Sequence, residues 1–301
     1  MKTVLYPAIA LMNRLNFGMK FSLISVLFFL PMAVTNYYLV SDSYDQYVRT
    51  STELESLELL GSTLKIRRDL EEVNDLALIS RMLGESSSAE ADARIAKLEQ
   101  SLIEQFAALQ AVSHDAQQVE QFNAQRDELL NAMRAIKAQV APVSKRAQGE
   151  ELLAKVQLFI KGVASDSGLS QDDSRDVRQM VELVMNVTPQ VTAVLATGRS
   201  VGAYSLGVGF LDSGASVKLE DALLLMEKLH AEYGLKIKET LAASPGAQRA
   251  LGNRTAASQE TLKELAKVFE DKVILAESLM GSWQEFFAEI SGEMEKTYQV
   301  N

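Results

Sequence analysis

The feature that most constrains this chain is an uncharged stretch of 21 residues, Phe21 to Ser41, flanked by Lys20 and Asp42. As an α-helix, a stretch of this length spans the hydrocarbon core of a bilayer, which is about 30 Å thick. The charged residues before it are all basic: Lys2, Arg14 and Lys20. Because positive segments stay in the cytoplasm, the sequence predicts a cytoplasmic segment (1–20), a transmembrane helix (21–41) and an outer domain (42–301).

This pattern indicates a single-pass protein of the bacterial inner membrane, with its main domain in the periplasm. A cleaved signal peptide is the alternative interpretation. The long basic region and the lack of a small-residue cleavage motif after the apolar run favour an uncleaved anchor.

The composition limits what the outer domain can be. The chain carries 40 acidic and 30 basic residues, and residues 1–40 contain no acidic residue, so the acidic excess lies beyond the apolar stretch. An acidic domain argues against nucleic acid as a partner, since phosphate binding needs clustered Lys and Arg. Cysteine is absent, which excludes disulfides and thiolate metal sites. Only five prolines and sixteen glycines interrupt a chain rich in strong helix formers.

Hydrophobic periodicity predicts an all-α, elongated up-and-down bundle of six or seven helices after the membrane helix. The first expected helix runs without a break from the membrane helix to Gly84, and others follow over about 88–112 and 116–140, in a shorter helix that ends near 162, and over about 170–209 and 217–243. Pro142 and Gly149 mark a break or kink between the third and fourth, which are either two consecutive short helices or one kinked helix. A segment opened by Ser244 and Pro245 follows, with residues near 252–255 expected to be irregular, and the last helix carries an apolar register from Leu262 to Met294. The last has the longest apolar register, and we expect it to pack along the first outer helix. Two stacked bundles sharing the long helices fit these lengths better than one uniform bundle.

A stripe of small residues follows bulky ones on the predicted helix 170–209, at Gly198, Gly202, Ser205 and Gly209. Such spacing lets another backbone approach closely, or leaves room for a bound molecule. Helix packing is the default interpretation, because no strand precedes the glycines and no phosphate-loop motif is present. Pro189 is expected to kink the same helix.

The entry sequence LMNRLNFGMKFSLISVLFFLPMAVTNYYLV, followed by a helical outer segment of about 260 residues, resembles the N-terminal half of bacterial methyl-accepting chemotaxis receptors. The resemblance is greatest to receptors with a helical bimodular ligand-binding domain, and GRSVGAYSLGVG at 198–209 is similar to the glycine-rich helix of such domains. Membership would imply a periplasmic domain that recognises a small molecule and passes a helix displacement to a kinase-coupled cytoplasmic rod.

The chain departs from this family in one respect, because its sequence has neither a second apolar span nor a methylated signalling hairpin. We therefore expect either the sensory portion of a longer receptor or a protein without that output. The chemotaxis kinase complex is a partner only if a cytoplasmic signalling part is missing from this sequence.

Five residues are candidates for ligand binding. Arg68 and Arg126 occupy positions otherwise filled by apolar residues, where a guanidinium could hold a carboxylate through paired hydrogen bonds. Arg199 and Tyr204 lie on the small-residue stretch and could line the same cavity, and Asp75 could fix a cationic group. Ordinary ion pairs with nearby Glu residues are favoured over ligand binding for each arginine taken alone, and a solvated surface position is favoured for Asp75.

The sequence supports no catalytic or metal site. Glu227 and His230 form a single Glu-x-x-His spacing, whereas a di-iron bundle needs two such motifs and further carboxylates, so a core or capping histidine is favoured. No nucleophile with a base and no cofactor motif is found, so we predict a non-enzymatic protein without a cofactor. The favoured hypothesis is a membrane-anchored, homodimeric sensor of a small, anionic metabolite. The alternative is a helical scaffold without a small-molecule ligand.

Overall fold

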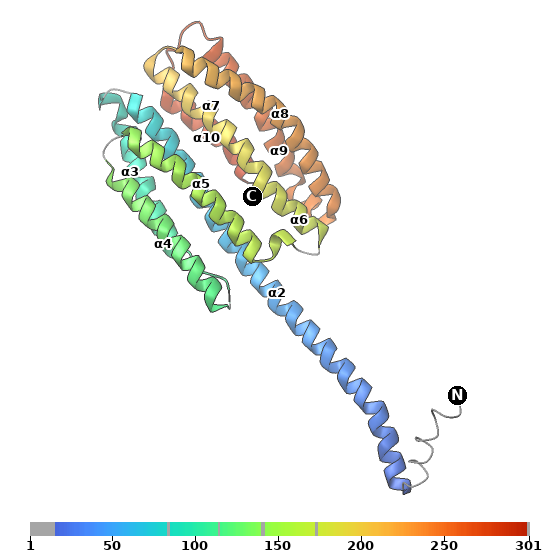
Figure 1. Cartoon of the computed structure of the whole chain (residues 1–301). Helices are drawn as coiled ribbons and strands as arrows, with labels where there is room; N and C mark the ends of the chain where they lie inside the picture. Colours follow the sequence, from blue (N-terminus) through green and yellow to red (C-terminus); the bar gives the residue numbers. More distant parts are fainter. Residues whose placement is uncertain (1–15, 83–84, 114, 140–141, 172–173, 300–301) are drawn as a thin grey trace. The chain divides into compact units, whose positions relative to one another are not determined.

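The computed structural model describes residues 16–82, 85–113, 115–139, 142–171 and 174–299 (Figure 1). It is 91% helical, with no strand in these ranges, which confirms the all-α fold class. The chain divides into two compact units, Met1–Thr52 and Glu53–Asn301. Most of the predicted cytoplasmic segment lies outside the described residues.

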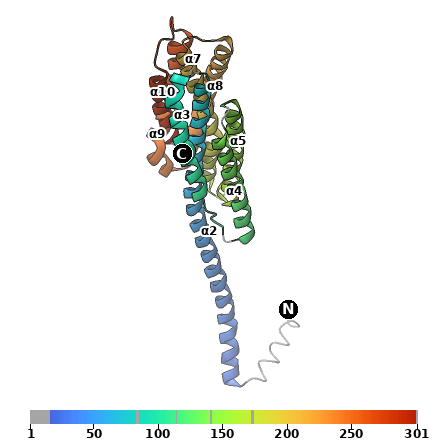
Figure 2. The ribbon, with the colours of Figure 1, turned by 90° about the vertical axis from the view of Figure 1, so that its left-hand side faces the viewer.

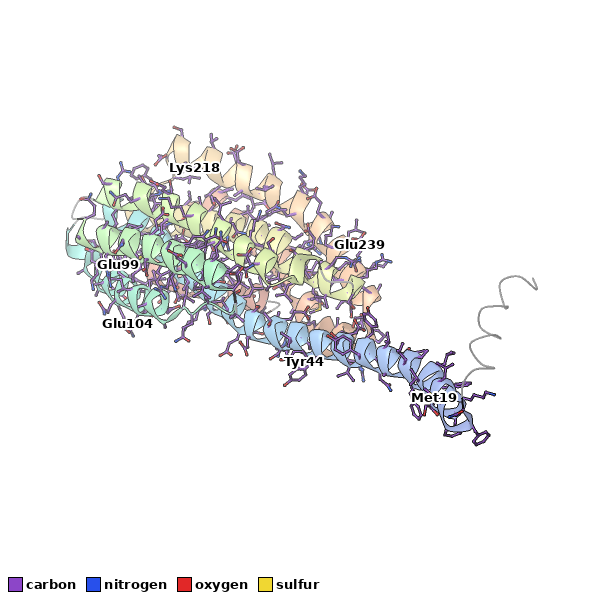
Figure 3. The ribbon with its side chains drawn as sticks, turned by 60° about the horizontal axis from the view of Figure 1, so that its bottom comes forward. Met19, Tyr44, Glu99, Glu104, Lys218 and Glu239 are labelled. Carbon is purple, nitrogen blue, oxygen red and sulfur yellow. The ribbon has the colours of Figure 1, made fainter. Side chains whose placement is uncertain are left out.

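The first helix described, α2 (Phe17–Met82), is a single helix of 66 residues. It confirms that the apolar stretch continues into the first outer helix without a break. In the first unit its side chains project outward, and Met19 and Tyr44 are 59% and 67% exposed (Figure 3). Its most apolar window has a mean hydropathy of 1.9 and no buried residue, so this helix is long and apolar enough to cross a membrane.

A second helical stretch, Arg175–Val208, also passes the length and hydropathy test, with a mean hydropathy of 1.2. Half of its apolar window is buried inside the protein. A helix that buries its apolar side chains against other helices belongs to a protein core, and this stretch is accordingly treated as a core element.

The second unit contains the remaining helices. In chain order they are α3 (Glu85–Ala108), α4 (Ala116–Ala138), α5 (Pro142–Asp166), the 3₁₀ turn η1 (Leu169–Gln171), α6 (Arg175–Glu182), the π-helical turn η2 (Leu183–Val187), α7 (Thr188–Val208), α8 (Ser213–Ala243), α9 (Pro245–Phe269), the π-helical turn η3 (Glu270–Ile274) and α10 (Trp283–Tyr298). The predicted bounds of α4 and α8 agree closely with these. The third and fourth predicted helices are two separate helices, because α4 ends at an extended Gln139 and α5 begins at Pro142, a position where proline is favoured since no N–H is needed there.

Within this unit the helices form two groups (Figures 1 and 2). Helices α3, α4 and α5 pack on one another, and helices α7 to α10 form the other group. The part of α2 after Glu53 contacts both groups, through Glu72 with Arg94 of α3 and through Asp75 with Arg199 of α7. Because α2 has helices on opposite sides, nearly every residue from Leu70 to Ile79 is buried.

The small-residue stripe of α7 is filled by aromatic rings. A Cβ atom at Gly198 would lie 2.1 Å from the Phe269 ring, and one at Gly202 would lie 2.7 Å from the Phe286 ring. The glycines therefore provide space for side chains of α9 and α10. This packing agrees with the default interpretation of the stripe, close helix packing.

The prediction of one long last helix is wrong. Residues 245–274 and 283–298 are separate helical segments, and the chain between them is not helical. The π-helical turn η3 ends the first segment, and the Ser282 side chain caps the second by accepting a hydrogen bond from the Glu285 N–H. The two segments pack against each other, and α10 contacts α2 through the ion pair of Glu295 with Arg68. An apolar register cannot distinguish one long helix from two helices that use the same face in turn.

Candidate functional site

The contact between α2 and α7 to α10 contains several charged side chains. Arg67, Glu71 and Asp75 are spaced four residues apart and therefore lie on one face of α2. All three are buried, with exposures of 7%, 4% and 8%. A buried charge is costly unless it is paired and hydrogen-bonded, so the partners of these groups decide what they can do.

Asp75 pairs with Arg199 of α7. The Arg199 Nε and Nη2 atoms donate to the same Asp75 carboxylate oxygen at 2.9 and 2.5 Å, and Nη1 donates to Ser291 of α10 at 2.9 Å. The guanidinium also lies 4.6 Å from the centroid of the Phe287 ring. Arg199 therefore ties α2, α7 and α10 together.

Arg67 and Glu71 form a second pair beside the first. Arg67 Nη2 donates to Glu71 at 2.8 Å and to the Pro189 carbonyl at 3.3 Å, while Nη1 donates to Thr192 at 3.1 Å. The other Glu71 oxygen accepts a hydrogen bond of 3.0 Å from the Tyr298 hydroxyl. Arg67 thus reaches from α2 to the start of α7, and Glu71 connects it to the last turn of α10.

Burial is the largest single influence on the pKa of Asp75, Tyr298 and Arg199. It raises the pKa of the Asp75 carboxyl to about 6, against the opposing effect of Arg199. Burial, together with the neighbouring Glu71, raises the pKa of the Tyr298 hydroxyl well above its usual range. For Arg199, burial lowers the pKa, but Asp75, Tyr298 and Glu72 together outweigh it and the net effect raises the pKa. Asp75 and Arg199 are therefore both charged at neutral pH.

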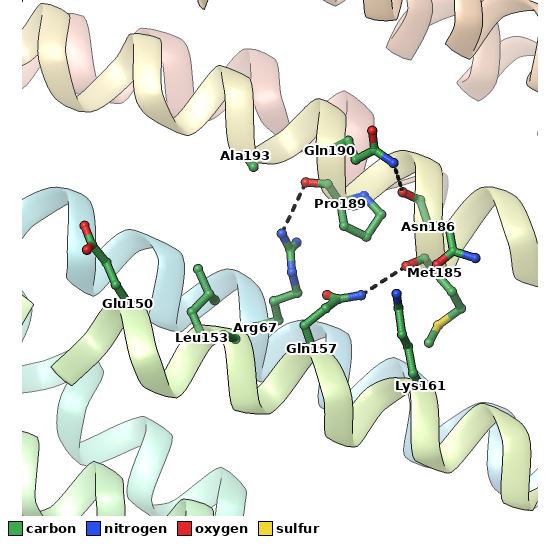
Figure 4. A pocket seen from close by; sticks show the side chains of 11 residues that line it. Arg67, Glu150, Leu153, Gln157, Lys161, Met185, Asn186, Pro189, Gln190 and Ala193 are labelled. Carbon is green, nitrogen blue, oxygen red and sulfur yellow. Dashed lines mark hydrogen bonds between the residues drawn. The ribbon is translucent and has the colours of Figure 1, made fainter. Parts of the chain in front are cut away.

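A pocket of about 430 Å³ opens between α5, α2 and the segment from η2 to α7 (Figure 4). Its apolar lining includes Leu153, Met185 and Pro189. Arg67 and Lys161 supply positive charge, and Glu150 lies toward the other end of α5. Glu150 is paired with Arg146 and Arg67 with Glu71, whereas the described residues give Lys161 no ion pair. The pocket therefore presents one uncompensated positive charge.

Gln157 lies in this pocket in an orientation that follows from Pro189. Proline has no N–H, so Pro189 cannot donate to the Met185 carbonyl four residues before it. The Gln157 Nε2 atom of α5 donates to that carbonyl instead, at 3.0 Å. The Gln157 Oε1 atom is buried and has no hydrogen-bond partner among the described residues.

The predicted site residues do not share one cavity. Arg199 and Asp75 are brought together, as a pair. Arg68 is half-exposed, pairs with Glu295 at 2.6 Å and lies over the Tyr298 ring.

The other two predicted residues lie elsewhere. Arg126 of α4 pairs with its neighbour Asp127 at 2.8 Å and donates to the Leu109 carbonyl, and the Tyr204 hydroxyl donates to Asp212 at 2.9 Å. None of the five predicted residues lines the pocket described above.

Sequence reasoning missed Arg67, Gln157 and Lys161. The sequence places Arg68 at a position otherwise filled by apolar residues and does not single out Arg67, whereas helices on both sides of α2 bury Arg67 and leave Arg68 half-exposed. Residues 150, 153, 154, 157 and 161 line the pocket at the spacing of one helix face, and that pattern of polar and apolar residues is visible in the sequence.

A second pocket, of about 500 Å³, lies between α8 and α9 and includes Glu227 and His230. The His230 Nδ1 atom lies 3.1 Å from the Gln259 carbonyl of α9, so the histidine links the two helices. Among the residues that the structure describes, no group of three or more His, Asp or Glu side chains is placed to hold a metal ion.

A scan against models of known protein families gave no match, and searches of curated proteins and of solved structures found no similar protein either. The function is therefore inferred from the chemistry of the site itself.

Proposed function

We propose that this protein is a membrane-anchored sensor whose outer helical domain binds a small anionic metabolite, like the sensory portion of a methyl-accepting chemotaxis receptor. In this proposal residues 21–41 anchor the chain in a bacterial inner membrane and residues 42–301 lie in the periplasm as a homodimer. The helix groups α3–α5 and α7–α10, both in contact with α2, are the basis for proposing two bundle modules.

The observation that carries this proposal is the pocket beside Arg67. It combines an apolar wall, three amide side chains and a lysine without an ion pair, which suits a small organic anion. Its position suits a sensor, because Arg67 is bonded to Glu71 and, through it, to Tyr298 of α10. An anion that forms hydrogen bonds with Arg67 would compete with Glu71 and so alter the contact between α2 and α10. The apolar anchor is part of the same helix, α2.

The test is a thermal-shift screen of the full chain in mild detergent against carboxylates, nitrate, sulfate, amines and purines. A ligand at a hundredfold excess over its Kd stabilises the folded state by about 2.7 kcal/mol, which is a measurable shift. We expect organic anions alone to raise the Tm, and Lys161→Gln to abolish the shift. Lys238→Gln, which removes an exposed positive charge from α8, is the matched control and should keep it. An anion response that survives Lys161→Gln would place binding elsewhere.

A helical scaffold without a small-molecule ligand is the second candidate. It is favoured by the pairing of Arg199 with Asp75 and of Arg67 with Glu71, since groups that satisfy one another can serve helix register alone. A folded protein that responds to no member of the panel would favour this candidate.

A further inference from the structure

We propose that Gln157 makes the pocket beside Arg67 selective for anions that carry a neutral hydrogen-bond donor, of which 2-hydroxycarboxylates are the simplest class. This inference rests on the proposed function, because it names the ligand class of the same pocket. It assigns a specificity role to a residue that touches neither of the buried ion pairs.

The first step is that the Gln157 amide has only one acceptable orientation. The Met185 carbonyl lacks the donor that a residue other than proline would supply at position 189. Gln157 Nε2 meets this need at 3.0 Å, and a rotated amide would place two oxygens against each other. Pro189 therefore holds Gln157 with its oxygen turned away from Met185.

The second step concerns that oxygen. Figure 4 shows the Gln157 Oε1 atom on the side of Arg67, inside the pocket that both residues line. The atom is buried and has no partner among the described residues. A buried acceptor without a donor is unfavourable, so a ligand that brings a donor gains affinity over one that does not.

The third step is that the donor must be neutral. Lys161 follows Gln157 by one helical turn on the same face of α5, so a carboxylate bound by Lys161 places its α-substituent near Gln157. Arg67 lies beside Gln157 and repels an ammonium group. A hydroxyl group donates a hydrogen bond without adding positive charge, which favours 2-hydroxy acids over both amino acids and unsubstituted acids.

The experiment compares acids that share a carbon skeleton. Calorimetry on the full chain in detergent measures the binding of three sets of acids, each with a hydroxy acid, an unsubstituted acid and an amino acid. The sets are glycolate, acetate and glycine; lactate, propionate and alanine; and 2-hydroxy-4-methylpentanoate, 4-methylpentanoate and leucine. In at least one set we expect the hydroxy acid to bind about tenfold more tightly than the unsubstituted acid, the effect of one hydrogen bond to a buried group. The amino acid should bind more weakly than the hydroxy acid.

Two variants test the assignment to Gln157. Gln157→Met keeps the length of the side chain but removes the acceptor, so the hydroxy and unsubstituted acids should bind equally. Pro189→Ala supplies an N–H for the Met185 carbonyl and frees the Gln157 amide to rotate, so the ratio of hydroxy-acid affinity to unsubstituted-acid affinity should fall. Gln248→Met, an exposed position on α9, is the control and should keep the tenfold ratio.

Three results would overturn the inference. Equal binding of hydroxy and unsubstituted acids, with both lost in Lys161→Gln, would refute the role of Gln157 and leave the proposed function standing. A hydroxyl preference that persists in Gln157→Met would refute the assignment to this residue. Absence of binding by every acid, in a folded protein, would refute both proposals.

Discussion

Two arginines and two carboxylates share the buried contact of α2 with α7 and α10. Removing one partner of a buried pair leaves the other charge unpaired, which typically destabilises a protein by about 3–5 kcal/mol. The sequence named Asp75 and Arg199 as candidates, although it favoured a solvated surface position for Asp75, which is in fact buried. It could not predict that they meet, since 124 residues separate them and their contact depends on which helices become neighbours. Arg67 and Arg68 point about 100° apart around the helix axis, a difference that an apolar register alone does not resolve when a helix has neighbours on both sides.

Asp75 should give the stability of the protein a distinct pH dependence. Its pKa is about 6 in the folded state and 3.8 ordinarily, so between these values the folded state binds the proton more tightly than the unfolded state. The contribution of Asp75 to the free energy of unfolding is therefore greatest below pH 4 and is lost as the pH rises through about 6. Between pH 7 and pH 5 it should increase by about 1 kcal/mol.

The measurement is the unfolding free energy of the wild type minus that of Asp75→Asn, at several pH values from 5 to 8. The asparagine of this variant cannot titrate, so the contributions of other groups largely cancel in the difference. We expect the unfolding free energy of the wild type to increase relative to that of the variant as the pH falls. A flat difference, or one that shifts in favour of the variant, would mean that burial does not control the ionisation of Asp75.

At the scale of helices, α7 shows why element types are easier to predict than element ends. The small residues of α7 were correctly expected to allow close packing, and Pro189 was correctly expected to disturb the helix. The disturbance takes the form of the π-helical turn η2, with Gln157 of α5 completing the hydrogen bonding at Met185. That compensation comes from a neighbouring helix and cannot be read from the local sequence. The break before α10 is of the same kind, because packing of α9 on α10 decides it.

The fit of aromatic rings against α7 predicts opposite effects for two Gly→Ala substitutions. Gly198→Ala places a methyl group 2.1 Å from the Phe269 ring, which is fully buried and cannot move into solvent. Such overpacking costs typically about 1–3 kcal/mol, more than the helix propensity that alanine adds. Gly198→Ala should therefore lower the free energy of unfolding.

Gly292→Ala is the matched control. A Cβ atom at Gly292 of α10 meets nothing within 4 Å, so the alanine should stabilise the helix by about 0.5–1 kcal/mol. Thermal unfolding of both variants, followed by circular dichroism, measures the two effects. Equal Tm values for the two variants would show that the packing of the Phe269 ring does not require a glycine at position 198.

For the molecule as a whole, the sequence predicted the fold class because composition and periodicity are properties of the entire chain. Few glycines and prolines among strong helix formers leave helices as the main solution, and the helical content confirms this. The grouping of helices around α2 was not predictable in the same way. Side-chain patterns tell which face of a helix is apolar, but the partner of that face depends on contacts between residues far apart in the chain.

The absence of cysteine allows the proposed topology to be tested with single introduced thiols. Lys218→Cys places a thiol on the exposed face of α8 (Figure 3), and Thr3→Cys places one in the basic N-terminal segment, outside the described residues. In right-side-out vesicles from a bacterial host, a membrane-impermeant maleimide should label the Lys218→Cys variant directly and the Thr3→Cys variant only after detergent is added. The physical reason is that the basic residues of the N-terminal segment hold it in the cytoplasm, while the acidic domain crosses. The opposite labelling pattern would reverse the orientation, and release of the protein by an alkaline wash would show that the apolar part of α2 does not anchor it in the bilayer.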